Sequence, residues 1–183
     1  MTRRVRQARL DDHEAVSAFT EDTWADRDGE DYIPRIFPRW VENNGPTQHT
    51  AVAVVDEQPV GICQAQVLAE NEGWLQGMRV DPDHRGEGHG NAMLDYLMDW
   101  LRERGVTAAR NMVFGWNTMG MGQSRAGGFD PQTACRWARP DPEPVDVADA
   151  VVEDADAAWR YWTHSEARRA LDGLALADDE SWA

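Results

Sequence analysis

The segment DPDHRGEGHGNAML, residues 81–94, constrains the fold more than any other part of this sequence. Gly86, Gly88 and Gly90 alternate with other residues, and an apolar pattern of helical period begins directly after them. Glycine costs conformational entropy and offers no side chain to pack. The three glycines therefore indicate either a tight strand-to-helix turn or a ligand that lies against bare backbone.

The chemistry of such a loop favours an anion. The first amides of a helix have no acceptors within the helix and carry partial positive charge. A glycine-rich loop also lets a phosphate group approach the backbone closely. A P-loop is excluded because the sequence contains no lysine, and a dinucleotide fingerprint is excluded because the strand after the loop ends without an acid. A plain turn with an incidental Arg85 stays open at this point.

The patterns around the loop predict a sheet with interleaved helices. Short turns after residues 56 and 70 make the strands at 49–56, 60–70 and 74–82 antiparallel. Further strands are expected at 3–10 and 106–116, and helices at 12–24, 91–105 and 117–127, while Pro34 and Pro38 should break a helix at 31–43. Gly77 within a strand predicts a bulge or a close approach. The fold class is therefore α/β (α+β), with a mixed, mostly antiparallel sheet flanked by helices.

The segment MRVDPDHRGEGHGNAML resembles the coenzyme A loop of the GNAT N-acetyltransferase superfamily. Arg85, Gly88 and Gly90 fill the Q/R-x-x-G-x-G/A signature of that family, and Asn117 with Gly128-Phe129 fits a second motif. The resemblance covers residues 3–139 in element order. It implies the GNAT fold, in which two parallel strands, here 74–80 and 106–114, splay apart in a V.

The resemblance also implies acetyl-coenzyme A as the co-substrate and no metal. His84 and His89 flank the loop, but no third ligand accompanies them in the sequence. An amine would attack the thioester directly in a ternary complex, with the backbone N–H of Met78 facing the developing oxyanion. The residues expected to bind the coenzyme are Met78, Arg79, Val80, Arg85, Gly86, Glu87, Gly88, His89, Gly90, Asn91, Asn117 and Ser124.

The catalytic residues expected are Ser124, Glu72 and Met78. Ser124 stands where the family commonly has a tyrosine that protonates the leaving thiolate, and a serine hydroxyl is a much weaker acid. It would relay a proton through water, or it would be a small helix residue with no proton role, while the thiolate leaves unaided. Glu72 is the favoured base by position, ahead of Glu70 and of Gln76 acting through water.

Charge adds a second constraint. The chain has 33 acidic residues against 18 basic ones, all of them arginine, for a net charge of -15. The acids are spread along the chain, which resembles cytosolic proteins of salt-loving microbes and predicts a cytoplasmic protein from a halophilic archaeon. Nucleic acid is excluded as a partner because no basic stripe exists to displace counterions. A membrane is excluded because no apolar run is long enough to span it.

These observations predict an N-acetyltransferase that acts on a primary amine of a small molecule or a protein. The alternative is a non-catalytic module that binds or senses acyl-coenzyme A. The partners expected are the amine acceptor and, as an option, a second copy in a homodimer. Residues 1–139 would form the acetyltransferase domain, residues 140–156 an acidic, proline-rich linker, and residues 157–183 a helical extension or the start of a second domain.

Overall fold

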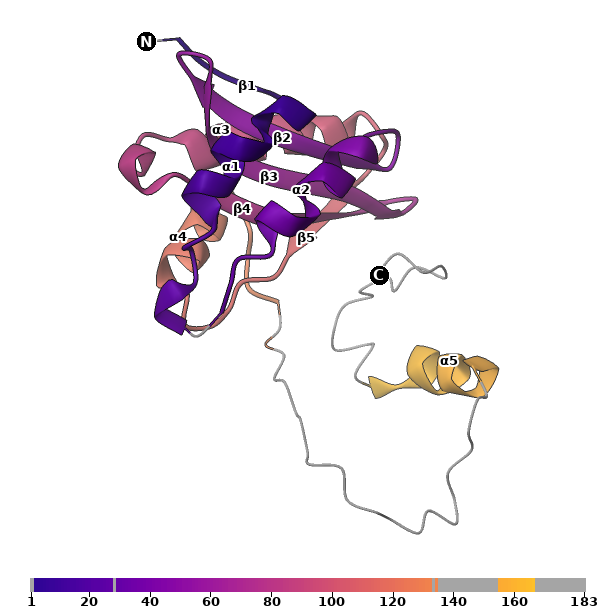
Figure 1. Ribbon diagram of the computed structural model, residues 1–183. Coiled ribbons are helices and arrows are strands. Elements are labelled where there is room, and N and C mark those ends of the chain that lie inside the picture. The colour runs from indigo at the N-terminus through magenta and orange to yellow at the C-terminus, as the bar shows by residue number, and fades with distance from the viewer. Residues whose placement is uncertain (1, 28, 133, 135–154, 167–183) are drawn as a thin grey trace. The chain divides into compact units, whose positions relative to one another are not determined.

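The fold is a five-stranded sheet with helices on both faces (Figure 1). A computed structural model describes residues 2–27, 29–132, 134 and 155–166. The strands are β1 (Arg3–Gln7), β2 (Gln48–Val55), β3 (Gln58–Ala69), β4 (Glu72–Val80) and β5 (Ala108–Asn111). The α-helices are α1 (His13–Thr20), α2 (Ile33–Glu42), α3 (His89–Arg102), α4 (Thr118–Ala126) and α5 (Ala155–His164), with short 3-10 turns at Leu10–Asp12, Ala25–Arg27 and Pro82–His84.

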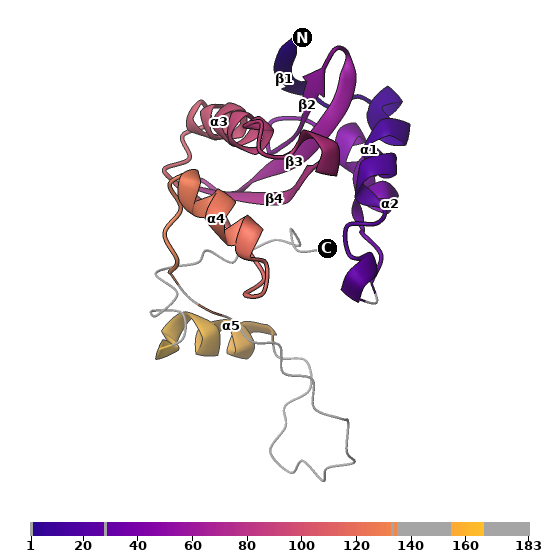
Figure 2. The same cartoon turned by 90° about the vertical axis from the view of Figure 1, so that its left-hand side faces the viewer.

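The strands follow the chain in the order β1-β2-β3-β4-β5. The first four are antiparallel neighbours, and β5 pairs with β4 in parallel. Helices α1 and α2 cover one face of the sheet and α3 covers the other (Figure 2). This arrangement confirms the predicted fold class of a mixed, mostly antiparallel sheet flanked by helices.

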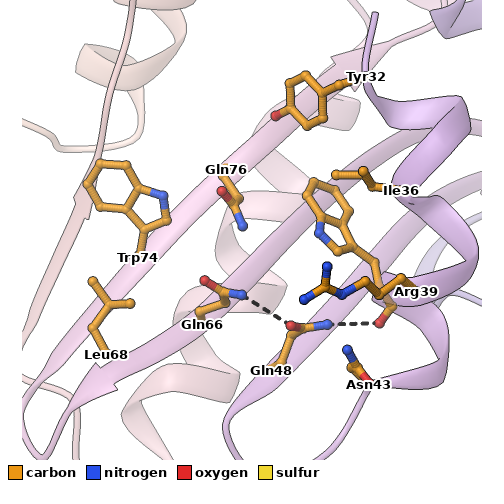
Figure 3. Close-up of a pocket in the computed structure, with 10 residues that line it drawn as sticks. Tyr32, Ile36, Arg39, Asn43, Gln48, Gln66, Leu68, Trp74 and Gln76 are labelled. Carbon is orange, nitrogen blue, oxygen red and sulfur yellow. Dashed lines mark hydrogen bonds between the residues drawn. The ribbon is translucent and has the colours of Figure 1, made fainter. Parts of the chain in front are cut away.

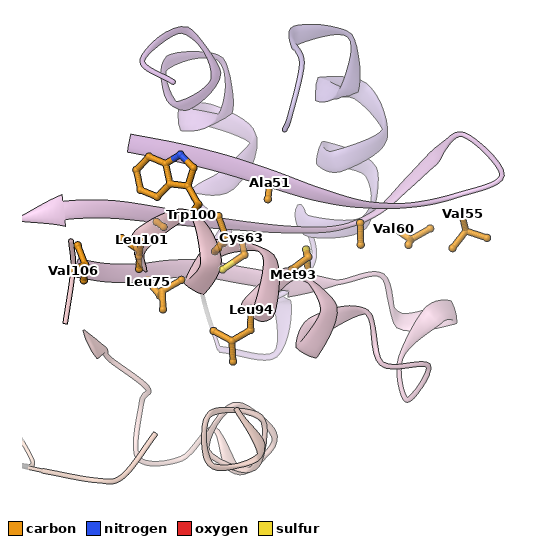
Figure 4. Close-up of a cluster of buried hydrophobic side chains, with 13 residues drawn as sticks. Ala51, Val55, Val60, Cys63, Leu75, Met93, Leu94, Trp100, Leu101 and Val106 are labelled. Carbon is orange, nitrogen blue, oxygen red and sulfur yellow. The ribbon is translucent and has the colours of Figure 1, made fainter. Parts of the chain in front are cut away.

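Both faces of the sheet are buried, and β2 explains how. Ala51, Ala53 and Val55 point to the α3 side, while Val52 and Val54 point to the side of α1 and α2. On the α3 side the predicted stripe of that helix forms the core, shown in Figure 4. Four of its residues are at most 8% exposed: Met93, Leu97, Trp100 and Leu101.

Strand β4 separates from β5 halfway along its length. The parallel pairing runs only from Glu72 opposite Ala108 to Leu75 opposite Asn111, so the rest of β4 has no strand partner on that side among the described residues. This is the predicted V. Gly77 marks a bulge just beyond the point of separation, with φ at +66° and Trp40 packed so closely that a Cβ would lie 2.5 Å from its ring. Both readings of Gly77 from the sequence are confirmed.

Helix α2 corrects the prediction of a broken helix. It runs from Ile33 to Glu42 with Pro34 in its first turn and Pro38 inside. A proline at position 38 cannot donate to the carbonyl of residue 34, which normally costs a hydrogen bond. The carbonyl of Pro34 instead lies 2.7 Å from Nε2 of His13, and the His13 ring stacks on Phe37. A side chain from α1 thus replaces the missing bond.

The length of the last strand also differs from the expectation. The strand expected at 106–116 is β5 with four residues, and Phe114 and Trp116 beyond it are each 43% exposed. Asp12 stands at the N-cap of α1 but makes no capping bond there, because its carboxylate accepts from both terminal nitrogens of Arg6 and from the backbone N–H of Arg9.

The sheet and its helices form one unit that ends at Phe129, and α5 lies in a second unit. The expected linker at 140–156 and most of the extension at 157–183 lie outside the described residues. None of the described helices is long and apolar enough to cross a membrane.

Candidate active site

The glycine loop begins at a 3-10 turn directly after β4. Asp81 caps that turn by accepting from the N–H of Asp83. Gly86 has φ at +77° and Gly88 has φ at +86°, a backbone conformation that other residues rarely adopt. A Cβ built on either glycine would meet no atom within 4 Å, so open space lies where the side chains would be.

The backbone amides of this loop are available to a ligand. Gly88 is the N-cap of α3 and offers no side-chain cap, and the intrahelical bonds begin with the N–H of Ala92 donating to the carbonyl of Gly88. In the described part of the chain, no protein group accepts from the amides of residues 86–91. Free amides at a helix start, beside glycines that leave room, suit a phosphate group. The residues present therefore fit the diphosphate of a coenzyme.

Gly90 has a different role from the other two glycines. A Cβ there would lie 3.0 Å from Oε1 of Gln123 on α4, so the glycine allows α4 to approach the start of α3. Nε2 of Gln123 also donates to Oδ1 of Asn91 at 2.6 Å. These contacts attach α4 to the first turn of α3, next to the glycine loop.

Charged side chains of the loop are held by the surrounding protein. Glu87 forms an ion pair of 2.7 Å with Arg3 of β1, and Nε of Arg85 donates to the carbonyl of Val80. His89 is 5% exposed, and its Nε2 lies 3.4 Å from the Glu87 carboxylate without a hydrogen bond to a described residue. The Arg3 ion pair offsets the negative charge that Glu87 would otherwise present to a phosphate.

The free edge of β4 carries the residues expected along the coenzyme arm. Met78 and Val80 pack toward the α3 core. The guanidinium of Arg79 makes an ion pair of 2.6 Å with Asp31, whose side chain is 0% exposed, and it also donates to the carbonyl of Met78. The Arg79 side chain thus belongs to the α1–α2 side of the sheet, away from the glycine loop.

Helix α4 contacts the end of β5 and the start of α3. Asn117 caps this helix, since its Oδ1 accepts from the N–H of Gly120 at 2.9 Å. Oγ of Ser124 accepts a hydrogen bond of 3.0 Å from Nδ2 of Asn111, the last residue of β5. Ser124 therefore lies where β5 ends and the gap beside β4 opens.

Glu72 occupies a different environment from the one its expected role as base requires. Its side chain is buried, with 4% of the residue exposed, and its carboxylate accepts from Nε of Arg110 at 2.6 Å. Glu72 is also opposite Ala108, at the closed end of the V, whereas Met78 lies in the open half. A base needs access to the amine, so the geometry favours a structural ion pair between β4 and β5.

Aromatic side chains join the α1–α2 loop to the loop after β5. Trp24 makes edge contacts with Phe114 and Trp116, with ring centroids 6.5 and 5.2 Å apart. Arg27 lies over the Trp116 ring at 3.7 Å, and Arg79 lies near Trp24 at 5.0 Å. The contacts of Trp24 thus link two loops that border the open half of the V.

A pocket of about 330 Å³ opens on the α2 side of β4 (Figure 3). It includes Trp40, Trp74 and Gln76, the last of which directly precedes the bulge. It also includes Tyr32 and Arg39, which sequence reasoning missed. Partial burial raises the pKa of Tyr32, so its hydroxyl is protonated at neutral pH.

The one free cysteine among the described residues, Cys63, takes no part in this chemistry. It is buried on β3, and its thiol lies within 3.4 Å of the carbonyl of Gln76. Burial raises the pKa of Cys63 to about 12, so the thiolate required of a nucleophile is scarce. No group of three or more His, Cys, Asp and Glu side chains suited to a metal occurs among the described residues.

Comparison with solved structures supports the fold. One is the aminoglycoside N-acetyltransferase AAC(6')-Iy with a coenzyme A bisubstrate analogue, at 15% identity, 78% of this chain, 100% of that chain and TM-score 0.64. Another is the PaiA N-acetyltransferase of Thermoplasma acidophilum with coenzyme A. It is 17% identical over 73% of this chain and 94% of that chain, with a TM-score of 0.65. A third is the ribosomal-protein-S18-alanine N-acetyltransferase of Escherichia coli. It is 22% identical over 72% of this chain and 80% of that chain, with a TM-score of 0.58. The comparison with curated proteins gives no match.

The sequence itself carries the family assignment. The model of the acetyltransferase (GNAT) family matches residues 9–118, which is more than half of the chain and spans α1, the glycine loop and the start of α4. The free loop amides and the V between β4 and β5 lie within that range. The chain therefore belongs to the acetyltransferase (GNAT) family.

Proposed function

We propose that this protein is an N-acetyltransferase that transfers the acetyl group of acetyl-coenzyme A to a primary amine. The observation that carries the proposal is the alignment of three features along one edge. The free amides of residues 86–91 follow β4 and its 3-10 turn, and the bulge at Gly77 lies on β4. Among the described residues, β4 has no strand partner on its β5 side beyond Leu75. A diphosphate fits the free amides, an extended arm fits the free edge of β4, and a thioester fits the position beside the bulge. Solved structures of similar fold that contain coenzyme A support the same reading.

In the reaction, the amine nitrogen attacks the carbonyl carbon of the thioester. A C–N bond forms, the C–S bond breaks, the thiolate leaves with the electron pair, and the attacking nitrogen loses a proton to solvent. The backbone N–H of Met78, beside the bulge, would face the oxygen that becomes negative. Fixed amides of this kind act mainly by positioning and electrostatic stabilisation.

Proton transfer is the part of the mechanism in which this chain departs from the family pattern. Ser124 replaces the usual tyrosine, and its oxygen already accepts from Asn111. The hydroxyl proton of Ser124 stays available, so we propose that Ser124 helps to orient a water near the leaving sulfur. We also propose that Gln76, which lines the pocket next to the bulge, orients the water that takes the amine proton.

Replacing Gly88 with Glu tests the coenzyme site. The substitution puts a carboxylate into the open space at the loop amides, where the diphosphate would lie. We expect the Kd for acetyl-coenzyme A, measured by calorimetry, to rise by about 100-fold or more. Gly105→Glu is the matched control, because Gly105 also has positive φ and open space but follows the other end of α3. Equal affinities of the two variants would contradict the site.

A non-catalytic module that senses acyl-coenzyme A is the second candidate. It is favoured by Ser124, because no phenol stands at the position that protonates the thiolate in the family. Release of free thiol with a panel of amines, measured at high salt, supports the enzyme. Tight coenzyme binding with no release from any amine supports the sensor.

A further inference from the structure

The pocket beside β4 has a lining that differs from the rest of this protein. Ten residues from α2 and the positions next to its two ends, β2, β3 and β4 line it (Figure 3). Tyr32, Trp40 and Trp74 supply aromatic surface, and Ile36 and Leu68 supply aliphatic surface. Such a wall suits the apolar body of a small molecule.

Arg39 is the one charged residue in this lining. No carboxylate lines the pocket, although acidic residues outnumber basic ones by 33 to 18 in the whole chain. Arg79 and Arg110 each make an ion pair of 2.6 Å, whereas Arg39 makes none with the residues that the structure describes. An arginine without a carboxylate partner is a ready binding group for the carboxylate of a ligand, because its planar fork matches that shape.

Three glutamine side chains of the pocket are held in place by hydrogen bonds. Nε2 of Gln66 donates to Gln48, and Nε2 of Gln48 donates to the carbonyl of Trp40. Nε2 of Gln76 donates to Oε1 of Gln64 at 2.6 Å, and no described residue donates to Oε1 of Gln76, so this oxygen can accept from a ligand. Because Gln76 directly precedes the bulge at Gly77, an amine bound to Gln76 would lie near the expected thioester.

We propose that this pocket binds an acceptor amine that also carries a carboxylate and an apolar body, such as an aromatic or aliphatic amino acid. The inference rests on the proposed acetyl transfer and names its acceptor class. Arg39 binds the carboxylate, the aromatic wall contacts the body, and Gln76 accepts from the amine. The net charge of -15 attracts cations at long range, but the pocket itself provides no carboxylate for the second charge of a polyamine.

Matched pairs of acceptors test the proposal. Phenylalanine is compared with phenethylamine, and tryptophan with tryptamine, since each pair differs only in the carboxylate; spermidine serves as a polycation. We expect kcat/KM for thiol release to be about tenfold or more higher with the carboxylate member of each pair. Equal rates within the pairs, or a preference for spermidine, would overturn the proposal.

The variant Arg39→Gln assigns the preference to one residue. It should raise KM for phenylalanine by about tenfold, leave the rate with phenethylamine unchanged, and leave the Kd for acetyl-coenzyme A unchanged. Arg35→Gln is the control, because Arg35 lies one turn earlier on α2, is exposed, and is not part of the lining. A carboxylate preference that survives in Arg39→Gln would overturn the role of Arg39.

Calorimetry with phenylalanine in the presence of coenzyme A separates this proposal from the proposed function. If phenylalanine binds the wild type and fails to bind Arg39→Gln but no amine releases thiol, the pocket assignment stands and the enzyme assignment fails. If thiol is released only with amines that lack a carboxylate, the enzyme assignment stands and the acceptor class is wrong. If phenylalanine neither binds nor reacts, the acceptor class is wrong as well.

Discussion

The carboxylate of Glu72 shows how single residues of this acidic chain are accommodated. It is buried at the closed end of the V, and Arg110 provides the opposite charge at 2.6 Å. Asp31 is buried in the same way against Arg79. A buried ion pair contributes little net stability, but removing one partner leaves an uncompensated charge and is costly. Both acids therefore have structural partners that limit their use as bases.

Glu72→Gln tests this structural assignment against the role of base. Because Arg110 loses its carboxylate, the free energy of unfolding in urea should fall by about 3 kcal/mol. We expect kcat to change less than about threefold, whereas loss of a general base costs about 100-fold or more. Glu70→Gln is the control, since Glu70 is exposed in the neighbouring turn. A stable Glu72→Gln protein with abolished turnover would restore Glu72 as the base.

The parts of the site that the sequence could predict are those determined by residues close together in the chain. Gly86 and Gly88 predict an open loop, because their backbone conformations depend on only a few neighbouring residues. The pocket around Tyr32 and Arg39 could not be predicted, because its side chains come from four separate elements. The burial of Glu72 could not be predicted either, since its partner Arg110 lies 38 positions away on another strand.

At the scale of the elements, the sheet and α3 were predictable and α2 was not. Alternation, short turns and an apolar stripe are local patterns, and the structure has β2, β3, β4 and α3 within a few residues of the predicted ranges. In α2 the sequence predicts a break at Pro38, but His13 from another helix satisfies the freed carbonyl. Long-range compensation of this kind leaves no local signal.

The packing of β2 against α3 includes the titratable side chain of His49. Its ring stacks on Trp100, with centroids 5.2 Å apart, and its Nε2 lies 3.2 Å from the hydroxyl of Tyr96. Burial, and then the nearby charge of Arg104, lower the pKa of His49 from 6.5 to about 4. The folded protein therefore keeps this histidine neutral at pH values where the unfolded chain protonates it.

This difference predicts a specific pH dependence of stability. Above pH 6.5 both states hold a neutral His49, and its contribution is fully present. As the pH falls from 6.5 toward 4, only the unfolded state gains the proton, so the free energy of unfolding decreases. Between pH 7 and pH 4.5 the wild type should lose about 2 kcal/mol more than His49→Gln in urea unfolding. Because the carboxylates are common to both proteins, equal losses would contradict this account.

The whole molecule combines two kinds of charge interaction that respond differently to salt. Buried pairs such as Asp31 with Arg79 are screened little, while exposed pairs such as Arg102 with Asp99 contribute at most about 1 kcal/mol each and weaken in salt. Against these stands the mutual repulsion of a net charge of -15. The repulsion acts over the whole surface and destabilises the compact state.

Salt should therefore stabilise this protein. The Debye length falls from about 10 Å at 0.1 M to about 3 Å at 1 M salt, so the repulsion is screened while the buried pairs persist. We expect Tm, followed by circular dichroism, to rise by about 5 °C or more between 0.05 and 2 M NaCl at pH 7. Near pH 4.6, the pI of the sequence, the net charge is close to zero and the same salt series should change Tm much less. A Tm that is flat at pH 7, or that rises equally at both pH values, would show that repulsion among the acidic residues does not limit the stability of this fold.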